Sequence, residues 1–313
     1  MRSIIAGVSL IALLLAVGCN HLMPNQRDSV ASGPAVNSAT PTVDNLIEYL
    51  NNNAAAVKPD QAITCRNVMI DVHAEGGQGG IDCKMICQAP RHFRLSGVAL
   101  GQPMVEVGSN DKEFWFWSKQ INPPYLFHCS YNDLANGVKV PFPFQPDMVL
   151  NALGLAPYDR TKKYTMKTVD DNKARRKLIE LTEQTLSPDH KPIQKITVFN
   201  SVTAELPQPQ VIAHIIKDEQ GRVVCSATIR YAQRVDGING PIIPRIVDFN
   251  WPEQKMKMTM RIENPSIIAM PPAKAASIFN RQDLQYQSVD LATQAMDGAG
   301  VQQAGGATQI YRR

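Results

Sequence analysis

The strict alternation of residues 255–263 constrains the fold of this chain most. In the run KMKMTMRIE, every second residue is methionine or isoleucine, and lysine, threonine or arginine stands between them. Successive side chains of a β-strand point to opposite faces, so the pattern predicts a strand with one apolar and one solvated face. The three methionines would then line one side of a sheet.

Strand-like segments recur along most of the chain, and short turns separate them. We count about eleven strands and two or three short helices. There is no strand–helix–strand rhythm, which argues against a parallel α/β sheet. The sequence therefore predicts a mainly β (α+β) fold, in which a strongly curved antiparallel sheet forms an incomplete barrel closed by a few short helices.

Two helices can be placed from their ends. Thr42 can cap a helix over residues 43–53, in which Leu46 and Leu50 share a face. A second helix is predicted from Pro146, because proline suits the first helical position, and Gly154 marks its end. The glycine-rich residues 76–80 are expected to form a loop.

The N-terminal residues indicate export. Arg2 precedes a short apolar run over residues 4–17, which is typical of a signal peptide and too short for a comfortable membrane span. The sequence LAVGC, ending at Cys19, resembles the bacterial lipobox, in which the cysteine after the cleavage site carries acyl chains such as palmitate. We expect a lipoprotein signal peptide over residues 1–18; an ordinary signal peptide with an incidental cysteine is the alternative.

The remaining chain divides into three parts. Polar residues 19–41 are expected to form a flexible tether from lipidated Cys19, residues 42–290 a single β domain, and residues 291–313 a disordered tail. Asn20 is not the aspartate that resembles an inner-membrane retention signal, so we expect anchoring in the outer membrane, facing the periplasm. The net charge is +4 without a lysine or arginine run, so no nucleic-acid partner is expected.

Five cysteines follow the anchor, an odd number, so at least one is not paired within the chain. A disulfide from Cys65 to Cys83 or Cys87 across a hairpin is the plausible bridge, while the pairing of the five cysteines, which include Cys129 and Cys225, stays open. The CxxC pairs of zinc modules are missing, so we expect buried thiols or a disulfide rather than a metal site.

Three stretches resemble, in order, the LolA/LolB superfamily of lipoprotein carriers, and the outer-membrane receptor LolB in particular. The first is the strand FRL at 93–95 with a loop that ends in Leu100 and Gly101. The second is VPFP at 140–143, before a helix that closes on LGL at 153–155. The third is PRI at 244–246, which leads to the strand at 255–263.

The resemblance implies an apolar cavity that takes acyl chains and a loop leucine, here Leu100, that helps transfer lipoproteins into the membrane. Methionine and aromatic side chains suit such a lining, because methionine is unbranched and adapts its shape. Each of them taken singly could also be ordinary core. The predicted cavity-lining residues are Phe93, Leu95, Trp115, Trp117, Trp251, Met256, Met258 and Met260.

Four consecutive aromatic residues, Phe114 to Trp117, stand out in a chain with only 6% aromatic residues. In a strand, the two phenylalanines face one way and the two tryptophans the other. We expect one pair to line the concave interior and the other to lie on the convex face beneath a covering segment, for which the N-terminal helix is a candidate. We favour the tryptophan pair as the inner one.

These features predict an outer-membrane-anchored lipoprotein that binds acyl chains of lipids or lipoproteins and helps their localisation. A soluble periplasmic carrier is a further expected partner. The alternative is an envelope sensor or assembly scaffold that uses the same fold to bind a protein. No GxSxG, HExxH or phosphate-binding glycine loop is present, and we expect no enzymatic activity, cofactor or metal.

Overall fold

A computed structural model describes residues 41–75, 77–121, 124–138, 146–172, 176–187, 190–200, 210–282 and 286–296. The predicted signal peptide, Cys19 and the tether up to residue 40 lie outside these ranges, as do residues 297–313. None of the helices in the described ranges is long and apolar enough to cross a membrane.

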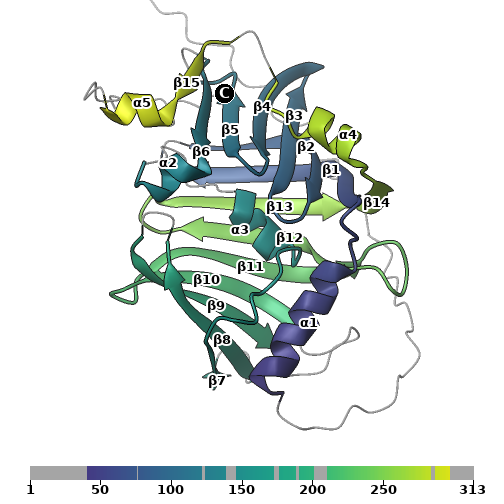
Figure 1. Ribbon diagram of the computed structural model, residues 1–313, viewed down its shortest axis with the longest axis vertical. Helices are drawn as coiled ribbons and strands as arrows, with labels where there is room; N and C mark the ends of the chain where they lie inside the picture. The colour runs from purple at the N-terminus through teal and green to yellow at the C-terminus, as the bar shows by residue number, and fades with distance from the viewer. Residues whose placement is uncertain are drawn as a thin grey trace, which may run out of the picture. The chain divides into compact units, whose positions relative to one another are not determined.

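One large, curved and unclosed sheet forms most of the domain, which confirms the predicted fold class (Figure 1). The strands are β1 (Gln61–Ala74), β2 (Gly77–Gln88), β3 (His92–Ala99), β4 (Gln102–Ser109), β5 (Glu113–Ser118), β6 (Leu126–Ser130), β7 (Tyr164–Asp171), β8 (Arg176–Leu186), β9 (Pro192–Asn200), β10 (Gln210–Asp218), β11 (Val223–Arg234), β12 (Ile242–Trp251), β13 (Met256–Glu263), β14 (Ser266–Ala269) and β15 (Ser288–Asp290).

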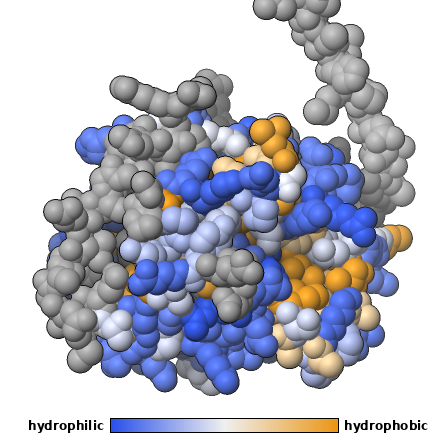
Figure 2. Space-filling model, turned by 90° about the horizontal axis from the view of Figure 1, so that it is seen from above, coloured by the Kyte–Doolittle hydropathy of each residue, from blue (hydrophilic) through white to orange (hydrophobic). Residues whose placement is uncertain are grey.

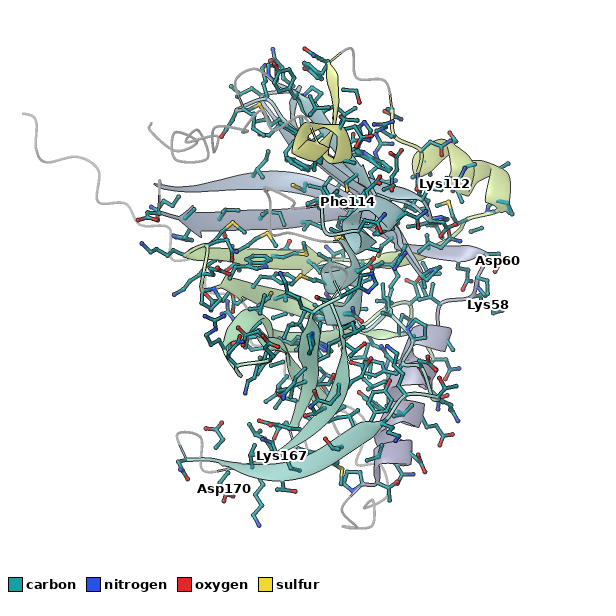
Figure 3. The ribbon with its side chains drawn as sticks, turned by 60° about the vertical axis from the view of Figure 1, so that its left-hand side comes forward. Lys58, Asp60, Lys112, Phe114, Lys167 and Asp170 are labelled. Carbon is teal, nitrogen blue, oxygen red and sulfur yellow. The ribbon has the colours of Figure 1, made fainter. Side chains whose placement is uncertain are left out.

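The spatial order of the strands is β15-β6-β5-β4-β3-β2-β1-β13-β12-β11-β10-β9-β8-β7, and β14 also pairs with β1. Neighbouring strands are antiparallel along β2 to β6 and β7 to β13, whereas β15 lies parallel to β6. The edge strand β7 carries Lys167 and Asp170 at the bottom of the domain (Figure 3). Charged side chains are a common feature of free edges, because they oppose pairing with another chain.

The alternating strand lies at the centre of the sheet. β13 pairs with β1 on one side and with β12 on the other. The first strand of the domain therefore pairs with a strand near its C-terminal end. Met256, Met258 and Met260 are at most 9% exposed, as the alternation predicts. They face the side of the sheet that α1 and α3 cover, here called the inner face.

Helix α1 (Val43–Ala55) begins after Thr42 and confirms the first predicted helix. Leu46, Ile47 and Leu50 pack against Ile179 and Leu181 of β8. The helix thereby covers the inner face of the lower strands rather than the aromatic strand. Its amphipathic pattern supplies the apolar stripe that this contact buries.

The second predicted helix is α3 (Pro146–Ala152), which lies in front of the middle strands (Figure 1). Three further helices are α2 (Tyr131–Ala135), α4 (Pro272–Ile278) and α5 (Leu291–Met296). Helix α5 occupies residues predicted to belong to the tail, so ordered structure continues past residue 290. The predicted loop over residues 76–80 is also wrong in part, since Gly77–Gly80 belong to β2 and pair with β1.

Residues at the end of α4 and Tyr286, just before β15, lie over the outer face of β3 to β6. Tyr286 stacks on Trp117 with ring centroids 4.7 Å apart, and both belong to a cluster with Trp115 and Leu126, here called the outer cluster. Arg94 donates to the carbonyl oxygen of Ile278 at 3.1 Å, which ties the end of α4 to β3.

A buried polar pair lies beside the outer cluster. Arg94 Nη2 is 2.9 Å from Glu106 Oε2, and the indole Nε1 of Trp115 donates to Glu106 Oε1 at 3.1 Å. The Trp115 ring lies against Gly108, where an added Cβ would be 2.2 Å from two ring carbons. Glycine at 108 is therefore required for the tryptophan to lie flat on the sheet.

The capping box of α1 provides a first test. Thr42 Oγ1 accepts from the Asn45 amide at 3.2 Å, and Asn45 Oδ1 accepts from the Thr42 amide at 3.2 Å. We expect Thr42→Ala to lower the free energy of unfolding by about 1 kcal/mol, because the first turn loses an acceptor. Urea denaturation measures the change; Thr42→Ser keeps the oxygen and should stay close to wild type, and an equal loss in both variants would contradict the assignment.

The packing of Trp115 on Gly108 gives a second prediction. Gly108→Val should destabilise the domain by about 1–3 kcal/mol, since either the indole or the strand must move. Thermal unfolding followed by tryptophan fluorescence reports both the stability and the environment of the ring. Ser96→Ala on the neighbouring strand adds no bulk and serves as control. Wild-type stability of Gly108→Val would show that the two residues do not pack as described.

Candidate functional site

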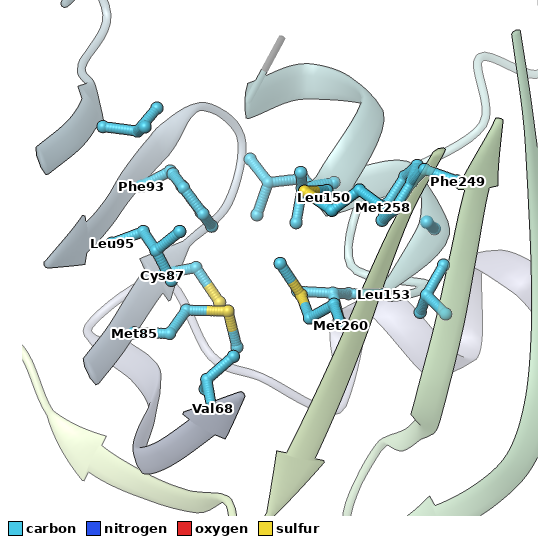
Figure 4. Close-up of a cluster of buried hydrophobic side chains, with 14 of the residues drawn as sticks. Val68, Met85, Cys87, Phe93, Leu95, Leu150, Leu153, Phe249, Met258 and Met260 are labelled. Carbon is cyan, nitrogen blue, oxygen red and sulfur yellow. The ribbon is translucent and has the colours of Figure 1, made fainter. Parts of the chain in front are cut away.

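A continuous apolar cluster fills the space between the inner face and α3. Strands β1, β2, β3, β12 and β13 contribute side chains to it. Leu150 of α3 and Leu153, the first residue after this helix, complete it from the other side. Figure 4 shows side chains from these elements turned toward one another. We call this set the interior cluster; its labelled members are Val68, Met85, Cys87, Phe93, Leu95, Leu150, Leu153, Phe249, Met258 and Met260.

Six of the eight residues predicted to line a cavity meet in the interior cluster. Each is at most 9% exposed. They reach it from strands that are far apart in sequence: β3, β12 and β13. These six residues are Phe93, Leu95, Trp251, Met256, Met258 and Met260.

Trp115 and Trp117 do not belong to the interior cluster, and the preference for them as the inner pair is wrong. The inner pair is Phe114 and Phe116, which pack with the interior cluster. Phe114 is labelled in Figure 3. The tryptophans lie in the outer cluster beneath the C-terminal segment, not beneath the N-terminal helix. Periodicity separates the two pairs but contains no information about which face is enclosed.

The interior is apolar as predicted, but its side chains pack on one another. A partly open cavity beside them measures about 40 Å³ and is lined in part by the polar residues Tyr49, Asn53, Asn151 and His214. That volume suits a few water molecules and is far below the roughly 300 Å³ at which ligand pockets begin. In this conformation, an acyl chain would have to displace protein side chains to enter the interior cluster.

Helix α3 covers the interior cluster with a short segment, most of whose apolar side chains are buried. It has only seven residues, and isolated helices of that length are unstable in water. Near its start, Asp147 forms a 3.4 Å ion pair with Arg91, whose guanidinium lies 4.2 Å above the Tyr131 ring. Burial raises the pKa of the Asp147 carboxyl, and Arg91 opposes the shift. The charge of Asp147 is thus poorly solvated where α3 begins.

Helix α1, by contrast, is fixed by several polar contacts. Asn53 donates to the carbonyl oxygens of Gly154 and Ile242 at 3.0 Å and accepts from the Ile242 amide at 2.7 Å. Nearby, burial lowers the pKa of His214 to about 4, so its imidazole is neutral at pH 7. The Asn53 contacts join α1 both to Gly154, just after α3, and to the start of β12.

All five cysteines of the domain are free and buried, so the disulfide predicted from Cys65 is wrong. Register explains this result, because Cys65 lies opposite Met85 rather than opposite Cys83 or Cys87. Burial raises the pKa values of Cys83 and Cys87 to about 12, which keeps both as unreactive thiols. Across the described ranges, no group of three or more His, Cys, Asp or Glu side chains could hold a metal ion.

Leu100 occupies the turn between β3 and β4 with φ 51° and is completely exposed. It is followed by Gly101, with φ 75°, so the turn uses two consecutive left-handed residues, which suits a tight hairpin. The neighbouring Val98 is 42% exposed. Seen from above, the surface is mostly hydrophilic with an apolar patch on the right of the view (Figure 2).

The predicted lining residues do not include several members of the interior cluster. Among these are Met85 of β2 and, from the segment of α3, Leu150 and Leu153. The spacing of Leu150 and Leu153 predicts that one face of the helix is buried. Only the tertiary structure shows which strands that face covers.

No protein-family model matches the chain, and no curated protein matches its sequence. Among solved structures, a domain described as an outer membrane lipoprotein-sorting protein from Vibrio parahaemolyticus aligns at 8% identity over 75% of this chain and 98% of its own, with a TM-score of 0.51. A DUF1329 family protein from Desulfovibrio piger aligns at 9% identity, with 72% and 93% coverage and a TM-score of 0.48.

A LolA superfamily protein from Nitrosomonas europaea aligns at 9% identity over 77% of this chain and 99% of its own, with a TM-score of 0.47. At such identities the likeness concerns architecture alone. This chain, with its large, curved and unclosed sheet and few short helices, shares the fold of the Vibrio parahaemolyticus domain.

Proposed function

We propose that this protein binds the acyl chains of lipids or lipoproteins in the interior cluster when α3 moves away from the sheet. The observation that carries the proposal is the composition of the cluster, in which Met85, Met258 and Met260 meet beneath a seven-residue helix. Unbranched thioether side chains adapt to chains of variable shape. The packed arrangement would be the empty state, and α3 the element that an acyl chain displaces.

The proposed location is the periplasmic face of the outer membrane, with lipidated Cys19 as anchor. The apolar run before Cys19 and the polar segment after it support this proposal. A soluble periplasmic carrier would deliver the cargo, and Leu100 would enter the bilayer during transfer. Complete exposure of a leucine at a hairpin tip favours contact with an apolar phase. The proposal assigns binding and transfer to the protein, not catalysis.

A second candidate function is an envelope sensor or assembly scaffold that binds a protein partner. The close packing of the interior cluster favours this candidate, because a permanently filled interior needs no ligand. The two functions differ in a measurable way, since only the first requires that α3 leave the sheet.

The first test follows uptake of dansyl-labelled fatty acids of increasing length by the delipidated protein. We expect saturable binding, and Met258→Ala should shift the preference toward longer chains, because it removes side-chain volume from the interior. Leu126→Ala removes similar volume from the outer cluster and should leave the preference unchanged. Circular dichroism checks that both variants fold. Absence of uptake by the folded wild type would favour the scaffold.

The second test concerns Leu100. Leu100→Ser should leave the free energy of unfolding within about 0.5 kcal/mol of wild type, because the side chain is fully exposed. Transfer of a lipoprotein from a carrier to liposomes should fall severalfold. Ile238→Ser, at a loop position that is 87% exposed, is the matched control. Equal transfer by both variants would remove Leu100 from the mechanism.

A further inference from the structure

The outer face of the central strands carries two neighbouring cross-strand rows of polar side chains. One row contains Asp248, Thr259 and Asp71, which lie opposite one another on β12, β13 and β1. The next row, two residues further along each strand, contains Asn250, Lys257 and His73. Both rows point to the same face because side chains alternate along a strand.

The first row is neutralised by its neighbours. Arg230 forms a two-pronged pair with Asp248 at 2.5 and 2.9 Å, and Thr259 donates to the same carboxylate at 2.7 Å. Arg261 forms an ion pair with Asp71. Every charged side chain named in this row therefore has an opposite charge beside it.

The second row lacks this compensation. Within the described ranges, neither Lys257 nor His73 has a hydrogen bond or ion pair to another side chain. Glu75, the carboxylate of the next row, already pairs with Lys255 at 3.0 Å. The two lysines and one glutamate that line the hollow leave one net positive charge.

These residues surround a surface hollow of about 390 Å³. Its walls are the ends of β1 and β12 and the turn between β12 and β13, and its lining residues are His73, Ala74, Glu75, Asn250, Pro252, Lys255 and Lys257. The hollow lies on the opposite face of β13 from its methionines, because Lys257 alternates with Met256 and Met258. It is therefore separate from the interior cluster.

We infer that the hollow is a binding site for a phosphate group, with Lys257, His73 and the Asn250 amide as donors. A phosphate presents several acceptor oxygens, and a row of three donors on adjacent strands can contact them together. The exposed Lys255–Glu75 pair contributes little by itself, so Lys255 can turn toward the ligand at small cost. The group can belong to a lipid headgroup or to a soluble phosphate ester.

This inference does not depend on acyl binding. If Lys257 and His73 were an ordinary surface pair, Lys257 would bind phosphate no better than any other exposed lysine. Lys84 provides that comparison, because it is exposed and lies on β2, outside the hollow. The contrast between Lys257 and Lys84 separates a site from general surface charge.

The experiment uses two probes on the purified chain. Titration with glycerol 3-phosphate, followed by NMR of the His73 ring and the Lys257 amide, tests the soluble ester. Flotation with phosphatidylglycerol vesicles, compared with phosphatidylcholine vesicles, tests the anionic headgroup in a membrane. Lys257→Gln should weaken the response about tenfold, as expected for a charge-assisted hydrogen bond, and Lys84→Gln should not.

Each outcome is decisive. Saturable shifts with glycerol 3-phosphate that Lys257→Gln removes support a site for soluble esters. Binding to phosphatidylglycerol vesicles that depends on Lys257, without such shifts, supports a headgroup site. The inference is overturned if Lys257→Gln and Lys84→Gln behave alike with both probes. Fatty-acid uptake, measured on the same variants, should remain at the wild-type level, so failure here is distinct from failure of acyl binding.

Discussion

The pairing of β1 with β13 is the contact on which the rest of the domain depends. Seven residue pairs, from Asn67–Glu263 to His73–Lys257, join the start of the domain to a strand almost two hundred residues later. This pairing makes one sheet of the segment β2–β6 and the segment β7–β12. Without it, neither half could bury its apolar face under the same helix.

Because of this pairing, the two faces of β13 lie in different surroundings. Met256 and Met258 belong to the interior cluster, whereas Lys257, between them, faces the hollow on the other side. A shift of one residue in the register would exchange the two faces and place lysine beneath α3. Burying that charge unpaired is strongly unfavourable, so the alternating sequence protects the register.

The domain also combines rigid and weakly held parts. Helix α1 is fixed by Asn53 and by apolar packing on β8, and the C-terminal segment is tied to β3 through Arg94. Helix α3 is only seven residues long, and a 3.4 Å ion pair from Asp147 to Arg91 lies near its start. Short helices are unstable on their own, which is why the proposed acyl site is placed under α3.

The sequence by itself determined most of the strands, although it predicted about eleven and the described residues form fifteen. It also determined two of the helices, α1 and α3, and the alternation that buries Met256, Met258 and Met260. These follow from local rules: side chains alternate in strands, and caps begin and end helices. It could not determine that Phe114 and Phe116 rather than the tryptophans face inward, that Cys65 lies opposite Met85, or that α3 fills the interior. Those outcomes depend on which face of a strand is enclosed and on the register between distant strands, and only the tertiary structure decides both.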